Sequence, residues 1–465
     1  MSDVLENLND IQGNILAGFN CDFQTFVGFS AKEHEIMAAT CQWLSGLSQD
    51  VSSVADVLAM RPLIRDATKN KDMTFLCVSI SKRLLSETQP DVFIRDNAFN
   101  NGMIKRAPSV LGDRTNPDEW HAGGYDNSID VFLIIAGNHR RGVIDKVKEL
   151  THDAEAIGLK RSYLEVGEKI GGLEHFGFQD GVSQPKVMDF DEGGDVGAGN
   201  FVFGYPKKAG ASNFSPVIDA RGVTVNGSLM VFRRLRQHVL VFRRFCELEA
   251  KRITGEGLEI DSAQLASLVV GRWPSGAQVR QDLHADPNLP SPQDNSFDFS
   301  DDSAAKHCPF GAHIRKVNPR NGSSDVVDVP RILRRGVPFG KTFDVAPSDE
   351  RGLLFICFQT SIKLQFESIT KQWMNSKINP GPGHDLLVGL STEQKTFTIN
   401  RSAGSAEVTD RDLSWITPTG GAYFLTPSRS GLEKLAGTPA PTLMFSAKKL
   451  AIETTDWISE TILRN

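Results

Sequence analysis

Asp180 is an acidic side chain whose surroundings suit proton transfer. It lies in the segment Glu-His-Phe-Gly-Phe-Gln-Asp-Gly-Val-Ser-Gln-Pro (174–185), where glycines allow sharp turns and two phenylalanines can pack against an apolar partner. A carboxylate in this setting either caps a turn or accepts a proton in a partly dry pocket. Local chemistry leaves both interpretations open, and the turn cap is the more common of the two.

His313 is a candidate ligand for a metal ion. It lies in Cys-Pro-Phe-Gly-Ala-His-Ile-Arg-Lys (308–316), and His307 and Cys308 are close to it in the chain. A zinc site would need further ligands at short spacing, and none follows. A lone histidine is either a hydrogen-bonded structural residue or the axial ligand of a haem iron, because the porphyrin supplies the other four ligands.

Arg334 and Arg335 are adjacent cations in an otherwise apolar segment, Arg-Ile-Leu-Arg-Arg-Gly-Val-Pro-Phe-Gly (331–340). Two neighbouring guanidinium groups are costly to bury together, so we expect at least one of them to have an anionic partner. For either residue the alternative is a surface salt bridge.

The composition excludes several classes of function. The 465 residues contain no Gly-x-x-x-x-Gly-Lys-Ser/Thr phosphate loop, no Gly-x-Ser-x-Gly and no His-Glu-x-x-His. The six cysteines form no Cys-x-x-Cys pair. A net charge of −6 argues against nucleic acid or an anionic membrane as the main partner. With no signal peptide visible and no apolar run near ~20 residues, we expect a cytoplasmic protein outside the membrane, and a secreted mature form stays open as the alternative.

These residues must be positioned by an α+β framework, because apolar β-rich runs alternate with amphipathic helical patterns. The glycine-rich and acidic stretch 189–199 is the candidate crossover between two halves, and the polar stretch 285–303 is expected to be a long loop. The patterns predict strands at 73–80, 130–136, 228–235 and 352–358, and helices at 31–46, 142–159, 239–253 and 361–374.

The three segments 174–185, 308–316 and 331–340 together strongly resemble the dye-decolourising peroxidase family, and their order and spacing match as well. Further segments at 11–16, 351–357 and 420–428 extend the resemblance over nearly the whole chain. The chain length and the long C-terminal half look like the larger bacterial and fungal subfamilies.

The resemblance implies two ferredoxin-like domains with antiparallel sheets and peripheral helices. They would cover residues 1–200 and 201–465, and one haem b per chain would lie mainly in the C-terminal domain. The implied activity is a peroxidase that reduces hydrogen peroxide and oxidises dyes, phenolics or similar donors through a ferryl haem. The alternative is a protein that stores or transfers haem, with incidental peroxidase activity. The oligomeric state, monomer or dimer, stays open.

The resemblance also implies roles for the three candidate residues. His313 looks like the proximal ligand of the iron, Asp180 like the distal acid and base, and Arg334 like the distal arginine. A distal carboxylate can move the proton of bound peroxide to the leaving oxygen, and an arginine can stabilise the negative charge that develops there. Since aspartate has a reference pKa of about 3.9, we expect an acidic optimum for dye oxidation.

Four further residues match the family pattern less specifically. Asp385 is the candidate carboxylate that is hydrogen-bonded to the proximal imidazole. Leu353 and Phe355 match apolar residues over the distal face of the haem, and Arg315 is a candidate partner of a haem propionate by charge and position.

Phe339 is a departure from the family pattern. Some members carry a tyrosine here that is linked to radical transfer toward the surface, and phenylalanine cannot form a phenoxyl radical. Bulky dyes would need another residue for radical transfer, for which Trp373 and Trp415 are candidates. For each of them, a buried core tryptophan is the more common interpretation. We therefore expect weaker activity on bulky dyes.

Overall fold

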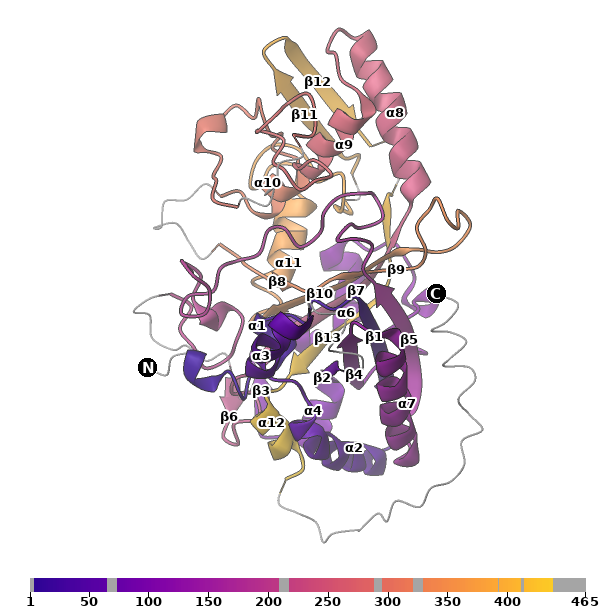
Figure 1. The fold of residues 1–465 in the computed structure, drawn as a ribbon, viewed down its shortest axis with the longest axis vertical. Helices are drawn as coiled ribbons and strands as arrows, with labels where there is room; N and C mark the ends of the chain where they lie inside the picture. The colour runs from indigo at the N-terminus through magenta and orange to yellow at the C-terminus, as the bar shows by residue number, and fades with distance from the viewer. Residues whose placement is uncertain are drawn as a thin grey trace.

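The computed structural model describes residues 4–64, 73–208, 217–287, 295–320, 329–391, 393–410 and 414–437 (Figure 1). Part of the expected loop at 285–303, namely 288–294, lies outside these residues. Within them, no helix is both long enough and apolar enough to cross a bilayer. All six cysteines are buried and unpaired, as expected for small apolar core residues.

The N-terminal half has the strand–helix–strand order predicted from the sequence, with every strand pair antiparallel. The four strands that it contributes to the main sheet lie in the order β2-β4-β1-β5, so that β1 and β4 are the inner strands, as in ferredoxin-like folds. The elements are β1 (Phe23–Ser30), α2 (His34–Gly46), α3 (Val54–Ile64), β2 (Thr74–Ser81), β4 (Val131–Gly137), α7 (Arg140–Ala156) and β5 (Lys160–Glu168).

The C-terminal half repeats this arrangement. Its strands lie in the order β13-β7-β10, with the short strands β9 and β8 both paired to β10. The elements are β7 (Ser228–Gln237), α8 (Val239–Gly255), α9 (Ser262–Val270), α10 (His313–Val317), β8 (Leu333–Arg334), β9 (Val337–Phe339), β10 (Gly352–Gln359), α11 (Phe366–Ser368), the π-helical turn η7 (Ile369–Met374) and β13 (Ile416–Thr426).

The two halves share one closed sheet. Strand β13 pairs with β2, strand β5 pairs with β9, and the additional pairing of β7 with β10 completes the ring. Aromatic rings from both halves fill its interior, so neither half has a complete core alone: Phe132 lies 4.8 Å from Phe232 and 5.1 Å from Phe424 between ring centroids. This shared core was not predicted from the sequence.

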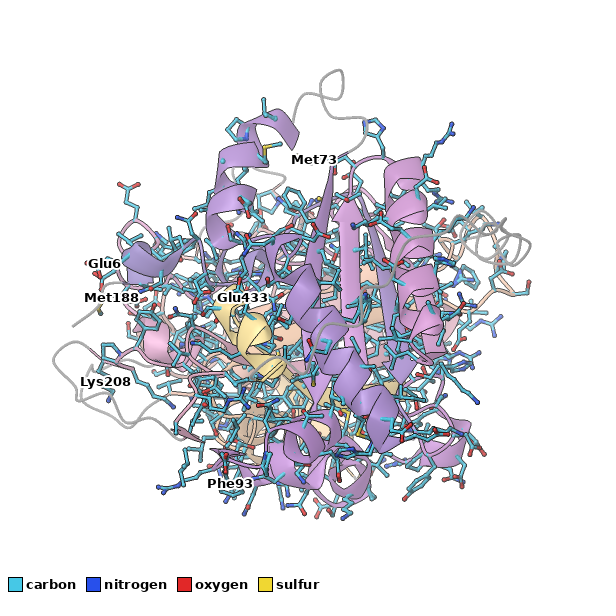
Figure 2. All side chains as sticks on the ribbon, turned by 90° about the horizontal axis from the view of Figure 1, so that it is seen from below. Glu6, Met73, Phe93, Met188, Lys208 and Glu433 are labelled. Carbon is cyan, nitrogen blue, oxygen red and sulfur yellow. The ribbon has the colours of Figure 1, made fainter. Side chains whose placement is uncertain are left out.

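Smaller elements surround this sheet. Figure 1 shows α2 and α7 at the end that carries the N-terminal strands, and α8, α9 and α10 together with β11 and β12 at the other end. Figure 2 gives the view from below, in which the labelled Glu433 lies on α12. The remaining elements include α1 (Gly13–Leu16), α4 (Lys82–Thr88), β3 (Val92–Ile94), β6 (Val217–Asp219), β11 (Thr396–Arg401), β12 (Gly404–Thr409) and α12 (Arg429–Leu435).

The predicted elements agree with the structure except at one helix. The segment predicted as a helix at 361–374 is helical only from Phe366, and from Ile369 onward its turns are π-helical. Hydrophobic periodicity does not distinguish an α-turn from a π-turn, and π-turns are frequent at functional sites.

The two faces of strand β10 have different surroundings. Leu354 and Ile356 are buried in the closed sheet, while Leu353 and Phe355 face the opposite side.

Candidate active site

A cavity of about 1110 Å³ lies in the C-terminal half, at the outer face of β7 and β10. Its volume is slightly larger than that of most small-molecule sites, which measure about 300–1,000 Å³. Leu353 and Phe355 line it together with Leu235, which is the cross-strand partner of Leu353. The segment 174–186 closes one side of the cavity, and η7 and the start of α10 close others. The site therefore has an apolar floor and walls from both halves of the chain.

His313 is the first residue of α10 and lines this cavity. Its Nδ1 atom lies 2.7 Å from Oδ2 of Asp385, whose side chain is fully buried. The other carboxylate oxygen accepts the backbone N–H groups of Leu387 and Val388. A carboxylate that accepts the Nδ1 proton fixes the imidazole tautomer and leaves Nε2 as the ligating atom. The expected pairing of His313 with Asp385 is thus present.

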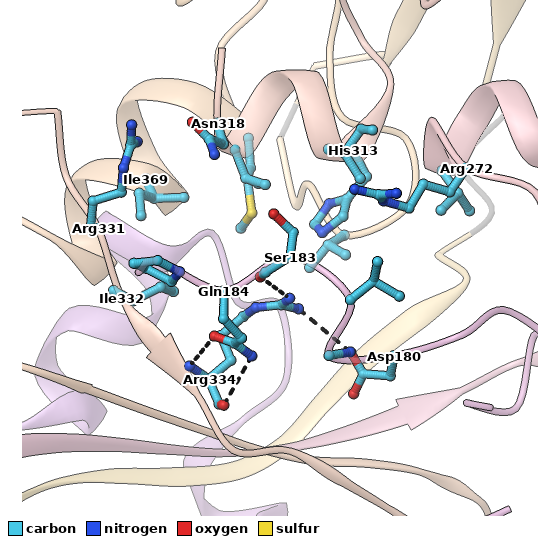
Figure 3. Close-up of a pocket in the computed structure, with 18 of the residues that line it drawn as sticks. Asp180, Ser183, Gln184, Arg272, His313, Asn318, Arg331, Ile332, Arg334 and Ile369 are labelled. Carbon is cyan, nitrogen blue, oxygen red and sulfur yellow. Dashed lines mark hydrogen bonds and ion pairs between the residues drawn. The ribbon is translucent and has the colours of Figure 1, made fainter. Parts of the chain in front are cut away.

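Asp180 lies across the cavity from His313, beside Arg334 (Figure 3). Its Oδ1 atom is 3.5 Å from Nη1 of Arg334, and both side chains are a little more than one quarter exposed. The backbone N–H of Asp180 donates to the carbonyl oxygen of Gly172, and Gly181 adopts the left-handed conformation at φ 74°. A carboxylate and a guanidinium group therefore lie together at a partly solvated wall.

The two adjacent arginines have different partners. Arg334 pairs with Asp180, whereas Arg335 points to the end of α1 and donates to the carbonyl oxygens of Asn14, Ile15 and Leu16. Burial lowers the pKa of Arg335 to about 10. The expected anionic partner is present for Arg334, and the C-terminal carbonyls of a helix serve the same purpose for Arg335.

Glu174 is a cavity residue that the sequence did not single out, although it opens the same segment as Asp180. Its carboxylate accepts the backbone N–H groups of Phe176 at 2.9 Å and Phe178 at 3.0 Å, and the side-chain amide of Gln237. Burial raises its pKa to about 7 despite these hydrogen bonds. Glu174 thus closes the turn that leads to Asp180, and its charge changes near neutral pH.

Arg315 does not lie at the cavity, contrary to expectation. Its guanidinium donates to the carboxylate of Asp302 at 2.9 Å and to the carbonyl oxygen of Cys308, and it is stacked between Phe299 and Phe310. The side chain is buried and is absent from the cavity lining. These four partners are also absent from the cavity lining, so this geometry does not favour contact with a haem propionate.

Other arginines line the cavity instead. Arg331 precedes β8, and its Nη1 atom is buried without a hydrogen-bond partner among the described residues. Arg320 donates to the hydroxyl of Ser183 at 2.9 Å. Both lie beyond the motif segments or at their edge, and only their charge could have indicated them in the sequence.

The residues present fit a haem group. The cavity offers one imidazole with its Nδ1 atom already bonded, an apolar floor, and an unpartnered buried guanidinium nitrogen that suits a carboxylate. Among the described residues, no cluster of three or more His, Cys, Asp or Glu could hold a metal ion by protein ligands alone. A porphyrin would supply the ligands that the protein does not.

The candidate relay residues differ in their surroundings. Trp415 is buried among Phe242 and Phe245, as expected of a core tryptophan. Trp373 is partly buried on η7, next to the cavity residue Met374. Phe339 is buried beneath Arg234, whose Cζ atom lies 4.2 Å from the centroid of the phenylalanine ring.

Comparison with known families assigns both halves of the chain. Residues 10–170 match the family model described as the DyP dimeric alpha+beta barrel domain, and residues 204–393 match the C-terminal domain of Dyp-type peroxidases. The match to two consecutive models agrees with the duplicated strand order.

Relatives of similar length cover almost the whole chain. A multifunctional dye peroxidase of Amycolatopsis sp. is 30% identical over 468 residues, which span 92% of this chain and 96% of that protein. A dye-decolorizing peroxidase of Mycetinis scorodonius is 29% identical over 92% of this chain and 87% of its own length. The structure of an ancestral D-type dye-decolorizing peroxidase covers 93% of this chain and 99% of its own, with a TM-score of 0.80 and 27% identity.

Proposed function

The chain belongs to the DyP-type peroxidase family, and we propose that it uses hydrogen peroxide to oxidise dyes, phenolics or similar aromatic donors at a haem. The observation that carries this proposal is the placement of His313 on one side of the cavity and the Asp180–Arg334 pair on the other (Figure 3). A ligand for iron and a proton-transfer group face the same space.

His313 would hold one haem b per chain through Nε2, and Leu353 and Phe355 would give it apolar contacts in the same cavity. Arg331 is the proposed partner of a propionate, and Arg320 is a second cation of the same cavity. Haem, when bound, supplies the iron at which peroxide is reduced and the oxidising power that donors consume. Asp385 keeps the imidazole in one orientation and increases its basicity.

Asp180 and Arg334 have different proposed roles in the reaction with peroxide. The Asp180 carboxylate would accept a proton from one oxygen of peroxide and return it to the other oxygen, which departs. The guanidinium of Arg334 would stabilise the negative charge on that oxygen with N–H groups that are already oriented. A carboxylate remains a competent base in acid, which supports the acidic optimum.

We also propose the division of the chain near residue 200, into 1–200 and 201–465. The segment 189–199 separates the last strand of one half from the first strand of the other, and the two family models leave residues 171–203 between them. The haem-storage alternative is not favoured, since the relatives are named as peroxidases.

The test is a single-turnover experiment with the haem-loaded protein. We expect a Soret band that disappears in His313→Ala, and a rapid spectral change when one equivalent of peroxide is added to the unaltered protein. Transfer of haem to an apo-acceptor without a reaction with peroxide would overturn the proposal and support the carrier.

A further inference from the structure

The side-chain amide of Gln184 is bonded to the backbone of Arg334 at both ends (Figure 3). Its Oε1 atom accepts the N–H of Arg334 at 3.1 Å, and its Nε2 atom donates to the carbonyl oxygen of Arg334 at 3.2 Å. Neighbouring strands exchange the same pair of hydrogen bonds in an antiparallel sheet. The Gln184 carboxamide therefore takes the place of a strand beside β8.

Strand β8 needs such a partner. It has only two residues and is the last strand in the order of the sheet, so β10 pairs with one edge of it, and within the described residues no strand pairs with the other. The backbone N–H and C=O of Arg334 lie on that second edge, at a partly buried wall of the cavity. Backbone polar groups away from water are costly without partners. The carbonyl oxygen of Arg334 also accepts from Nη1 of Arg335 at 2.9 Å, whereas the N–H of Arg334 donates to the Gln184 amide, which is therefore most important for the N–H.

The same short segment also holds the side chain of Arg334. The carbonyl oxygen of Ser183 accepts from Nη2 at 2.8 Å, while Nη1 lies 3.5 Å from Oδ1 of Asp180. Pro185 follows Gln184 and disfavours helical backbone at Gln184, so the side chain starts from an extended segment. Residues 180–184 therefore fix the backbone of Arg334, its guanidinium and the carboxylate beside it as one unit.

We propose that Gln184 is a positioning residue that sets the place of Arg334 relative to Asp180. It acts through Arg334 and needs no contact with peroxide. Its effect on the rate rests on the proposed peroxidase function, whereas its effect on the Arg334 backbone does not. A displacement of about 1 Å in a reacting group can lower a rate by about 100-fold, so loss of this clamp has a measurable effect.

Amide hydrogen exchange tests the positioning directly. In the haem-loaded Gln184→Leu protein we expect the peptide that contains Arg334 to exchange at least 10-fold faster, while peptides from β7 and β10 keep their protection. Gln372→Leu is the matched control, because Gln372 is exposed on η7 and the same change there removes an amide from the surface. Unchanged protection at Arg334 would overturn the proposal.

The rate of reaction with peroxide tests whether the clamp acts through Arg334. We expect the second-order rate constant to fall by about 10- to 100-fold in Gln184→Leu at unchanged haem content. In the Arg334→Leu background, Gln184→Leu should cause no further loss, because residues that act through one group are not additive. A full additional loss in that background would overturn the proposal.

Gln184→Glu separates hydrogen bonding from packing. A protonated carboxyl has a donor and an acceptor like the carboxamide, whereas the ionised form has only acceptors. We expect the ratio of the rate constant of this variant to that of the unaltered protein to be close to one in acid and to fall as pH rises. A ratio independent of pH would contradict the proposed hydrogen bonds. If the unaltered protein itself failed to react with peroxide, the proposed function would fail, and the exchange experiment would still decide the role of Gln184.

Discussion

The Nδ1 atom of His313 lies 2.7 Å from a carboxylate oxygen of Asp385, and that carboxylate has no contact with solvent. Its second oxygen accepts two backbone N–H groups, from Leu387 and Val388. The orientation of the imidazole is therefore fixed by the loop at 383–388 and does not depend on a bound metal. The pair determines which ring nitrogen faces the cavity.

Replacing Asp385 tests this relationship. Asp385→Asn keeps the size of the side chain but removes its charge, so we expect haem to bind and the rate of reaction with peroxide to fall by about 10- to 100-fold. The reduction potential of the iron should rise, because a neutral partner makes the imidazole a weaker donor. Potentiometry and stopped-flow spectroscopy measure both effects. Asp145→Asn, at an exposed position on α7, should change neither.

Asp180→Asn tests the proposed role of Asp180 in proton transfer. The amide cannot accept the proton of peroxide, so we expect the second-order rate constant with peroxide to fall by about 100- to 10,000-fold. The Soret band and the haem content should stay unchanged, because His313 is intact. Stopped-flow measurements from acidic to neutral pH would give the rate. Full reactivity of this variant would contradict the proposed role of Asp180.

The residues of the site differ in how far the sequence could predict them. Asp180, His313 and Arg334 each lie in a distinctive local segment, and the structure brings all three to one cavity. Arg315 also lies in such a segment, yet the direction of its side chain depends on Asp302, and a contact across 13 positions leaves no local signal. The amide of Gln184 bonds Arg334 across 150 positions and was missed for the same reason.

The fold shows a similar limit. Each half could be predicted as α+β from its periodic apolar runs, since these patterns are local. The closure of the sheet depends on the β13–β2 and β5–β9 pairings, which join strands hundreds of residues apart in one case and about 170 in the other. Register between distant strands is set by packing of the shared aromatic interior, and this information is absent from either strand alone.

Replacing Arg315 should affect stability, whereas replacing Arg331 should affect haem binding. Arg315→Met would leave the buried Asp302 carboxylate without its cation, so we expect the free energy of unfolding to fall by about 3–5 kcal/mol. Arg331→Met removes a partly buried cation of the cavity, so we expect haem affinity to fall by about 10-fold or more, with little loss of stability.

Urea unfolding and haem titration distinguish these two effects. Both variants replace an arginine with an apolar chain of similar length, so each serves as the control for the other. A selective loss of haem affinity in Arg315→Met, at unchanged stability, would restore Arg315 as a partner of the propionate.

Glu174 predicts a dependence of stability on pH. Burial raises its pKa from 4.5 to about 7, so between these values the folded protein holds a proton that the unfolded chain has released. The contribution of Glu174 to the free energy of unfolding is therefore largest in acid and decreases as pH rises from about 4.5 to 7. We expect the free energy of unfolding, measured with urea, to change less between pH 5 and pH 8 in Glu174→Gln than in the unaltered protein, because the glutamine has no charge to bury. Equal differences for the two proteins would show that the carboxylate of Glu174 is not the group that titrates in this range.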